Sequence, residues 1–304
     1  MTALVSVFVR AYHSWNHGGK IYDDPLAAQI LTPEEYAGIA ESMTEGMAFF
    51  RPGFNGAPEE ALRWIVENQL APSVLGRAAF AEQALEKAME EGMEQYVILG
   101  AGYDTFAWRR PVWADGLRVF EVDRPAIGRD KRRRAENLSD GTPTNLFFVE
   151  ADFEEQRPLR GLKDSASYRT DRRTFFSLPG VVYYLPQDGF TELLREIAEI
   201  APVGSRLAFD YPDENTHTEK AGERARKQVA MAAAASEKML AGYSREQMEA
   251  KLSACGFSVC EHLMPEDITE RFFLPYNRKN PAHPMTAFDN VNYCLARLTA
   301  SRCE

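Results

Sequence analysis

The spacing of apolar residues along the chain changes near residue 92. Before that point apolar side chains recur at helical intervals, and two helix starts are visible. Asp24-Pro25 offers an N-cap followed by proline at the first helical position, and Thr32 to Glu35 forms a capping box. The Gly and Pro residues between Arg51 and Ala57 predict a loop, and a long helix is expected from Ser73 to Glu91, ending at Gly92.

After residue 92, short apolar runs alternate with helical segments. Helices are predicted at 187–200 and at 244–255, the second opened by a capping box of Ser244 and Gln247. Strands are predicted at 96–99, 117–122, 146–149, 174–184, 206–211, 257–263 and 290–298. This alternation predicts an α/β fold with a doubly wound, mostly parallel sheet covered by helices on both faces.

One long segment interrupts the alternation. Residues 213–241 are highly charged and alanine-rich, so we expect them to be helical. They follow a predicted strand at the edge where open α/β sheets bind ligands, and are interpreted as a lid or, equally, as a solvated connecting helix. We therefore expect one domain over 1–304. It comprises a helical cap (1–92), an α/β core (93–212 and 243–304) and a lid insertion (213–242).

Composition excludes several classes of protein. With 45% hydrophobic residues among 304, the chain can bury a sizeable core, and its net charge of -10 argues against a nucleic-acid partner. The basic run from Arg129 to Arg134 is interpreted as the solvated face of a helix. The sequence shows no secretory signal and no apolar stretch long enough for a membrane, so we expect a cytoplasmic protein. No metal site is expected, because no paired ligand spacing involves Cys255, Cys260, Cys294 or Cys303.

The most informative motif is the glycine-rich turn from Leu99 to Asp104, which ends the first predicted strand. Glycines let a ligand approach the backbone, and the N–H groups of a following helix can bind it. Thr105 stands where a dinucleotide-binding fingerprint has its third glycine, which weakens the case for a pyrophosphate. Glu121-Val122-Asp123 ends the next strand, where an acid can accept hydrogen bonds from ribose hydroxyls. A ligand with a ribose but no pyrophosphate fits both features, and S-adenosylmethionine is the commonest.

A third motif, Glu150-Ala151-Asp152-Phe153, ends the third predicted strand. A carboxylate at Asp152 can accept a hydrogen bond from an adenine amino group, or it can serve as a turn or cap residue. Considered together with the two earlier motifs, Asp152 is predicted to bind the adenine.

Together these motifs resemble the leucine carboxyl methyltransferase family, and more closely its bacterial branch of O-methyltransferases of polyketide biosynthesis. The resemblance covers nearly the whole chain. Its carriers are Arg10-Ala11-Tyr12, Tyr22 to Ala27, Arg77, Val97 to Thr105, Phe120 to Pro125 and Val182 to Leu185. It implies a class I methyltransferase (Rossmann-like) fold with an antiparallel last strand, S-adenosylmethionine as cofactor and S-adenosylhomocysteine as product.

The resemblance also implies roles for individual residues. Arg77 matches an arginine that binds the methionine carboxylate, as a bidentate guanidinium can. The other expected cofactor contacts are Gly100, Ala101 and Gly102 for the methionine part, Asp123 with Glu121 for the ribose, Asp152 and Phe153 for the adenine, and Arg10 from an N-terminal segment that folds over the cofactor.

One position departs from the family pattern. Many members carry a glutamate that contacts the methionine amino group, and here that position is Pro179. The ammonium must then find another acceptor, such as a backbone carbonyl near Leu99 or Pro179.

Several tyrosines and histidines are candidates for assisting methyl transfer. Transfer from a sulfonium is an in-line displacement for which the protein supplies position and electrostatics. A carboxylate acceptor is already ionised at neutral pH, whereas a phenol would benefit from a base, most naturally a histidine. Aromatic faces near the sulfonium could come from Tyr12, Tyr103, Tyr183 or Tyr211. The catalytic candidates are Tyr12, His13, Tyr183 and Tyr211, with His17 beside His13 and His217 in the expected lid.

The leading prediction is an O-methyltransferase acting on a carboxylate or hydroxyl of a small molecule. One alternative is an S-adenosylmethionine-binding module that has lost turnover, for which Pro179 is the support. The other is a nicotinamide-dependent oxidoreductase, which Thr105 and the missing third glycine oppose.

Overall fold

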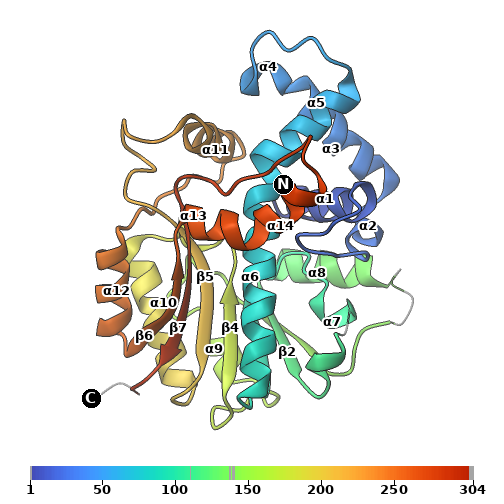
Figure 1. Cartoon of the computed structure of the whole chain (residues 1–304). Helices are drawn as coiled ribbons and strands as arrows, with labels where there is room; N and C mark the ends of the chain where they lie inside the picture. The colour runs from blue at the N-terminus through green and yellow to red at the C-terminus, as the bar shows by residue number, and fades with distance from the viewer. Residues whose placement is uncertain (1, 110, 137, 139–140, 301–304) are drawn as a thin grey trace.

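A seven-stranded sheet forms the centre of the molecule (Figure 1). The structure is a computed structural model that describes residues 2–109, 111–136, 138 and 141–300, so Cys303 lies outside the described residues. The strand order is β3-β2-β1-β4-β5-β7-β6, and only β7 runs antiparallel to its two neighbours. The predicted α/β fold, mostly parallel with an antiparallel last strand, is confirmed.

The observed strands follow the predicted ones closely, with one exception. They are β1 (Gln95–Leu99), β2 (Arg118–Asp123), β3 (Leu146–Glu150), β4 (Thr174–Leu178), β5 (Arg206–Pro212), β6 (Phe257–Leu263) and β7 (Val291–Leu298). The prediction of a strand over 174–184 is wrong beyond Leu178. Pro179 has no N–H for the ladder, and Gly180 adopts a φ of 72°, so the chain turns into the short 3-10 helix η3 (Val182–Tyr184).

Helices dominate the first 90 residues, as predicted. They are α1 (Thr2–Asn16), α2 (Ala27–Ile30), α3 (Pro33–Glu45), α4 (Met47–Phe50), α5 (Pro58–Ile65), the π-helix η1 (Val66–Leu70) and α6 (Ala71–Glu90). The predicted capping box is present, because Thr32 Oγ1 accepts from the N–H of Glu35 and Glu35 Oε2 accepts from that of Thr32.

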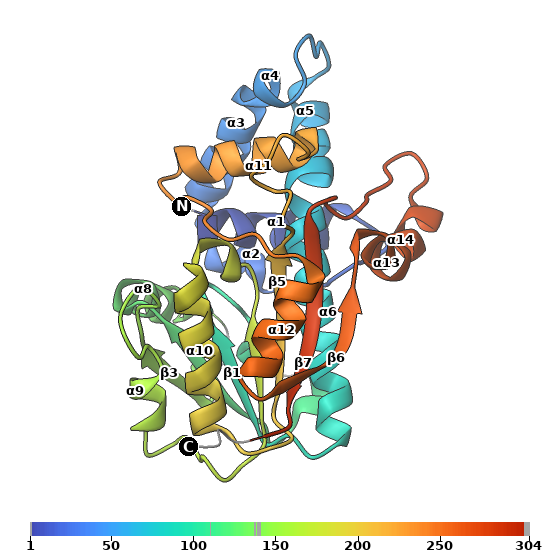
Figure 2. The same ribbon diagram turned by 90° about the vertical axis from the view of Figure 1, so that its left-hand side faces the viewer.

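The remaining helices lie between and after the strands along the chain. They are α7 (Phe106–Arg109), η2 (Val112–Ala114), α8 (Pro125–Ala135), α9 (Arg160–Lys163), α10 (Gln187–Ile200), α11 (Glu223–Ala234), α12 (Arg245–Ala254), α13 (Pro265–Ile268), η4 (Thr269–Phe273) and α14 (Leu274–Lys279). α6 packs in one apolar cluster on one face of the sheet, and α9, α10 and α12 pack in another on the opposite face (Figure 2). The predicted helix at 244–255 is confirmed with its capping box, whereas α13, η4 and α14 had no counterpart in the sequence analysis.

The segment 213–241 is less helical than predicted, since only α11 is a helix. Before α11, Asp213 Oδ1 accepts from the N–H of Asn215 and from Thr216 Oγ1, which closes a turn instead of a helix. After α11, Ser236 adopts a φ of 61°. α11 lies beside the cap above the carboxyl edge of the sheet, and Lys227 Nζ donates to the carbonyl of Phe50 (2.6 Å) (Figure 2).

In the described part of the chain, no helix is both long and apolar enough to cross a bilayer.

Candidate cofactor site

The carboxyl ends of the neighbouring strands β1 to β5 lie at one edge of the sheet, and the glycine-rich turn follows β1, the middle strand of these five. Gly100 and Gly102 adopt φ values of 71° and 51°. A Cβ on Gly100 would lie 2.5 Å from Cγ2 of Val181, so only glycine allows the turn to pack against the chain that follows β4. The N–H of Gly102 donates to Asp123 Oδ2 (2.6 Å), which fixes the turn to the end of β2.

The two acids of β2 have different surroundings. Asp123 is partly exposed at the strand end, whereas Glu121 is 3% exposed and pairs with Lys131 of α8 (2.5 Å). Burial raises the pKa of Glu121 to about 7, although Lys131 acts in the opposite direction. Ala101, Gly102, Glu121 and Asp123 all line a small hollow beside α8. Asp123 is therefore the accessible acid, and Glu121 reaches the hollow as half of a buried ion pair.

The interpretation of the basic run as a solvated face is wrong for Lys131, which is buried. Its side chain is 1% exposed because it neutralises Glu121, and Arg134 is held by Glu35 and Asp130. Arg133, by contrast, is exposed, as a solvated face requires. A charged run in a sequence does not reveal which of its members faces an acid of the sheet.

Asp152 and Phe153 follow β3 in an irregular turn. Asp152 Oδ1 accepts from the N–H of Glu154 (3.0 Å), and Oδ2 lies 3.2 Å from Nε of Arg124. Phe153 is partly buried against the apolar cluster of α10. In the structure Asp152 therefore acts as a turn residue, which was the alternative role considered from the sequence. It lies at the strand end where the adenine is predicted to bind.

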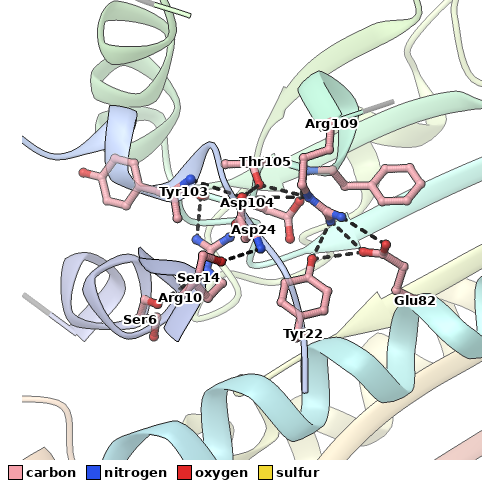
Figure 3. Close-up of polar contacts among 12 residues, drawn as sticks. Ser6, Arg10, Ser14, Tyr22, Asp24, Glu82, Tyr103, Asp104, Thr105 and Arg109 are labelled. Atoms are coloured by element: carbon pink, nitrogen blue, oxygen red, sulfur yellow. Dashed lines mark hydrogen bonds and ion pairs between the residues drawn. The ribbon is translucent and has the colours of Figure 1, made fainter. Parts of the chain in front are cut away.

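The N-terminal segment crosses the glycine-rich turn and is fastened to it by buried polar contacts (Figure 3). Arg10 pairs with Asp24 Oδ2 (2.5 Å) and donates to the carbonyl of Tyr103 (2.8 Å). Asp24 Oδ1 accepts from Thr105 Oγ1 (2.7 Å) and from the N–H of Ala27. Arg10 therefore lies over the turn, and its contacts in the structure are with the protein, so its contact with the cofactor stays a prediction.

A second group of contacts secures the same segment to α6. Arg109 forms two hydrogen bonds to the carboxylate of Glu82 and also contacts the hydroxyl of Tyr22, which in turn donates to Glu82 (3.0 Å) (Figure 3). We call α1 with the following residues to Pro25 the N-terminal strap. Its motif residues Arg10, Tyr22 and Asp24 all contribute to fastening it.

Arg77 extends from α6 toward the turn after β4. Its Nη1 lies 3.7 Å from Asp210 Oδ2, and its side chain is 19% exposed. A Cβ on Gly180 would come within 2.3 Å of Nη1, so a glycine is needed where the guanidinium lies against the turn. Among the described residues Arg77 makes this ion pair but no hydrogen bond, which leaves its donors for a ligand.

Asp210 is the site residue that the sequence analysis missed. It is 1% exposed near the end of β5, where Oδ1 accepts from the N–H of Gly180 (2.6 Å) and Oδ2 from the hydroxyl of Tyr183 (2.9 Å). An acid inside the otherwise apolar run from Leu207 to Tyr211 was the available signal, because a buried carboxylate needs a partner.

The catalytic candidates are scattered over the structure. Tyr183 lies at the site through its bond to Asp210, and burial together with that carboxylate raises its pKa well above the usual value. Tyr211 bonds to His262 (2.7 Å) and packs in the cluster of α10 and α12, on the face opposite to Asp210. Tyr12 packs beside His17 in the strap.

His13 is also part of the strap. It is fully buried, its Nε2 accepts from the N–H of Ile21 (3.0 Å), and burial lowers its pKa to about 3. No contact joins any histidine of the described residues to Arg77, Tyr183 or Asp210. In the same part of the chain, no group of three His, Cys, Asp or Glu residues is placed to hold a metal ion.

These residues fit S-adenosylmethionine by chemistry and placement. Arg77 offers unused donors for a carboxylate, and Asp123 offers a partly exposed carboxylate for ribose hydroxyls. The turn between them is built of glycines whose positive φ brings the backbone to the surface. The predicted groups thus occupy one edge of the sheet, with the strap above.

Comparison with known proteins agrees with this picture. The family model described as leucine carboxyl methyltransferase matches residues 3–198. The Bacillus subtilis protein named "Putative S-adenosyl-L-methionine-dependent methyltransferase YktD" is 36% identical over 301 residues, 97% of each chain. The crystal structure of a DUF574 family protein from Streptomyces avermitilis is similar in fold, with a TM-score of 0.60 over 96% of both chains at 16% identity.

Proposed function

The chain belongs to the leucine carboxyl methyltransferase family, and from this premise we propose that it methylates an oxygen, a carboxylate or a hydroxyl, of a small molecule. It is an S-adenosylmethionine-dependent methyltransferase of class I fold. The observation that carries the proposal is Arg77, whose guanidinium lies against Gly180 with its hydrogen-bond donors unused.

Bound S-adenosylmethionine supplies an electrophilic methyl group on a sulfonium, and S-adenosylhomocysteine is the product after transfer. The chain's own residues bind and orient it. Arg77 binds the carboxylate, and Asp123 accepts from the ribose hydroxyls. The strap limits water at the glycine-rich turn, where a Cβ on Gly102 would lie 3.7 Å from Cβ of Ala3. Held in this way, the methyl group can be aligned with an acceptor oxygen.

A carboxylate is the acceptor that the site favours. It is already ionised at neutral pH and needs no base, which agrees with the lack of a histidine contact at Arg77, Tyr183 or Asp210 in the described residues. We also propose that residues 213–242 act as a lid over this acceptor. The N–H groups of Leu240 and Ala241 both donate to the carbonyl of Tyr183, which connects this segment to the site.

A methyl-transfer assay with two groups of acceptors tests the proposal. Small carboxylic acids and phenols are incubated separately with S-adenosylmethionine carrying a labelled methyl group. Methyl esters release labelled methanol in base, whereas aryl ethers do not. With a carboxylate acceptor the rate should be flat between about pH 6 and 9, and with a phenol it should rise toward the phenol pKa near 10.

Asp123→Ala is the control for cofactor-dependent transfer in both groups. Cofactor binding without transfer to any acceptor oxygen would contradict the proposal and support the binding-module alternative.

A further inference from the structure

A buried carboxylate with incomplete neutralisation lies beside Arg77. Asp210 is 1% exposed, yet its guanidinium partner is 3.7 Å away, beyond hydrogen-bond distance. Its two hydrogen bonds come from the N–H of Gly180 and the hydroxyl of Tyr183, neither of which carries a charge. Burying an ionised carboxylate is costly unless it is paired, so this position favours a second cation.

The sheet register places Asp210 beside the turn that departs from the family pattern. Leu178 of β4 is aligned with Phe209 of β5, so Pro179 and Asp210 follow at the same level of adjacent parallel strands. Leu178 and Phe209 both face the cluster of α10, and successive side chains alternate between faces. Asp210 therefore faces the α6 side, toward Arg77, at the carboxyl edge of the sheet.

We propose that Asp210 binds the ammonium of the cofactor's amino-acid end, while Arg77 binds the carboxylate. An α-amino acid carries both charges on one carbon, so its partners must be an anion and a cation close together, as Asp210 and Arg77 are. An ionised carboxylate offers about four lone-pair sites, and two hydrogen bonds leave capacity for an ammonium donor. The inference rests on the cofactor of the proposed function but not on its acceptor.

Calorimetric titration with four ligands separates the two charges. S-adenosylhomocysteine carries both, one analogue lacks only the amino group, another lacks only the carboxylate, and 5′-methylthioadenosine lacks both. Asp210→Asn keeps the shape and an acceptor for Gly180. It should weaken both amino-bearing ligands on the order of ten- to a hundredfold, and leave the other two within about twofold of wild type.

The control Asp188→Asn removes an exposed acid of α10 and should bind all four ligands like wild type. If Asp210 only positioned Arg77, Asp210→Asn would weaken the analogue that keeps the carboxylate, and that result would overturn the inference. Unchanged binding of all four ligands would overturn it too.

A measurement on the wild type alone covers the case in which Asp210→Asn does not fold. The analogue that keeps only the amino group should bind at least about tenfold more tightly than 5′-methylthioadenosine. Equal affinity would overturn the role of Asp210. Failure of folded wild type to bind any of the four would instead reject the cofactor site, and tight binding without methyl transfer would reject only the proposed acceptor chemistry.

Discussion

The two halves of the carboxyl edge use their charged groups differently. Around β1 and β2, under the strap, charges are paired within the protein: Arg10 with Asp24, and Lys131 with Glu121, both at 2.5 Å. Around β4 and β5, Arg77 and Asp210 are 3.7 Å apart and no hydrogen bond joins them. These two pairs of the first half are internally neutralised, whereas the second half keeps an open pair of opposite charges.

This difference distinguishes charged pairs that stabilise the fold from a charged pair that can bind a ligand. Close, buried pairs hold the strap and the glycine-rich turn together, and removing one partner leaves a charge stranded in the interior. An open pair adds little to the fold but can bind a zwitterion, because its hydrogen-bonding capacity is unused. Substitutions of the closely paired groups in the first half should therefore lower stability, whereas substitutions of the open pair, like those of the partly exposed Asp123, should lower affinity.

The largest expected effect is at Asp24, in the internally neutralised half. Asp24→Ala strands the buried guanidinium of Arg10 and removes the acceptor of Thr105, so we expect a loss of about 3–5 kcal/mol in the free energy of unfolding. Urea denaturation measures it. The neighbouring Asp23 is exposed, and Asp23→Ala should stay within about 0.5 kcal/mol of wild type. Equal effects at the two positions would show that the strap does not depend on this pair.

A smaller, pH-dependent effect is expected from His13 in the strap. Burial lowers its folded-state pKa to about 3, so the unfolded chain takes up a proton first as the pH falls below the ordinary value near 6.5. Its contribution to stability is present above pH 6.5 and is lost as the pH falls toward 3. When the pH is lowered from 7.5 to 5, the free energy of unfolding of His13→Gln should therefore rise by about 2 kcal/mol relative to that of the wild type.

Denaturation curves at those two pH values test the effect of His13. Burial raises the pKa of Glu67 to about 7, so Glu67 changes the stability in the opposite sense over part of this range. The quantity to compare is therefore the difference in free energy of unfolding between the variant and the wild type. A His13→Gln difference that does not change with pH would contradict the buried, neutral state of His13.

The smallest effect on stability, yet a specific effect on affinity, is expected at Gly180 in the open half. A Cβ there would meet Nη1 of Arg77, and the φ of 72° disfavours any other residue. Gly92 has a φ of 84° but open space around it, so Gly92→Ala has the backbone strain alone. Both variants should lose about 1–2 kcal/mol of stability, and only Gly180→Ala should also bind S-adenosylhomocysteine about tenfold or more weakly. Equal affinities in calorimetry would contradict the placement of Arg77.

Much of the fold could be predicted from the sequence because buried parallel strands are continuous apolar runs. The glycine-rich turn and Asp123 were also predictable, since they belong to contiguous motifs at strand ends. The end of β4 was missed because Pro179 and Gly180 interrupt a run that remains apolar. The extent of helix over 213–241 was overestimated, because local composition does not reveal side-chain turns such as that of Asp213.

The open half of the site was harder to predict because it depends on contacts between distant parts of the chain. Asp210 meets Arg77 only through the register of β4 with β5 and the packing of α6 on the sheet. Lys131 is buried only because Glu121 faces it from β2. A single sequence gives neither the register nor the facing residue, so such pairs require the three-dimensional structure.

Calorimetric titration of the wild type and of Asp123→Ala with S-adenosylhomocysteine tests the cofactor site most directly. Asp115→Ala, which removes an exposed acid before β2, is the matched control. Wild type and Asp115→Ala should bind with a dissociation constant on the order of micromolar, and Asp123→Ala should show no measurable binding while remaining folded. Absence of binding by folded wild type, or undiminished binding by Asp123→Ala, would contradict a cofactor site at the carboxyl ends of β1 and β2.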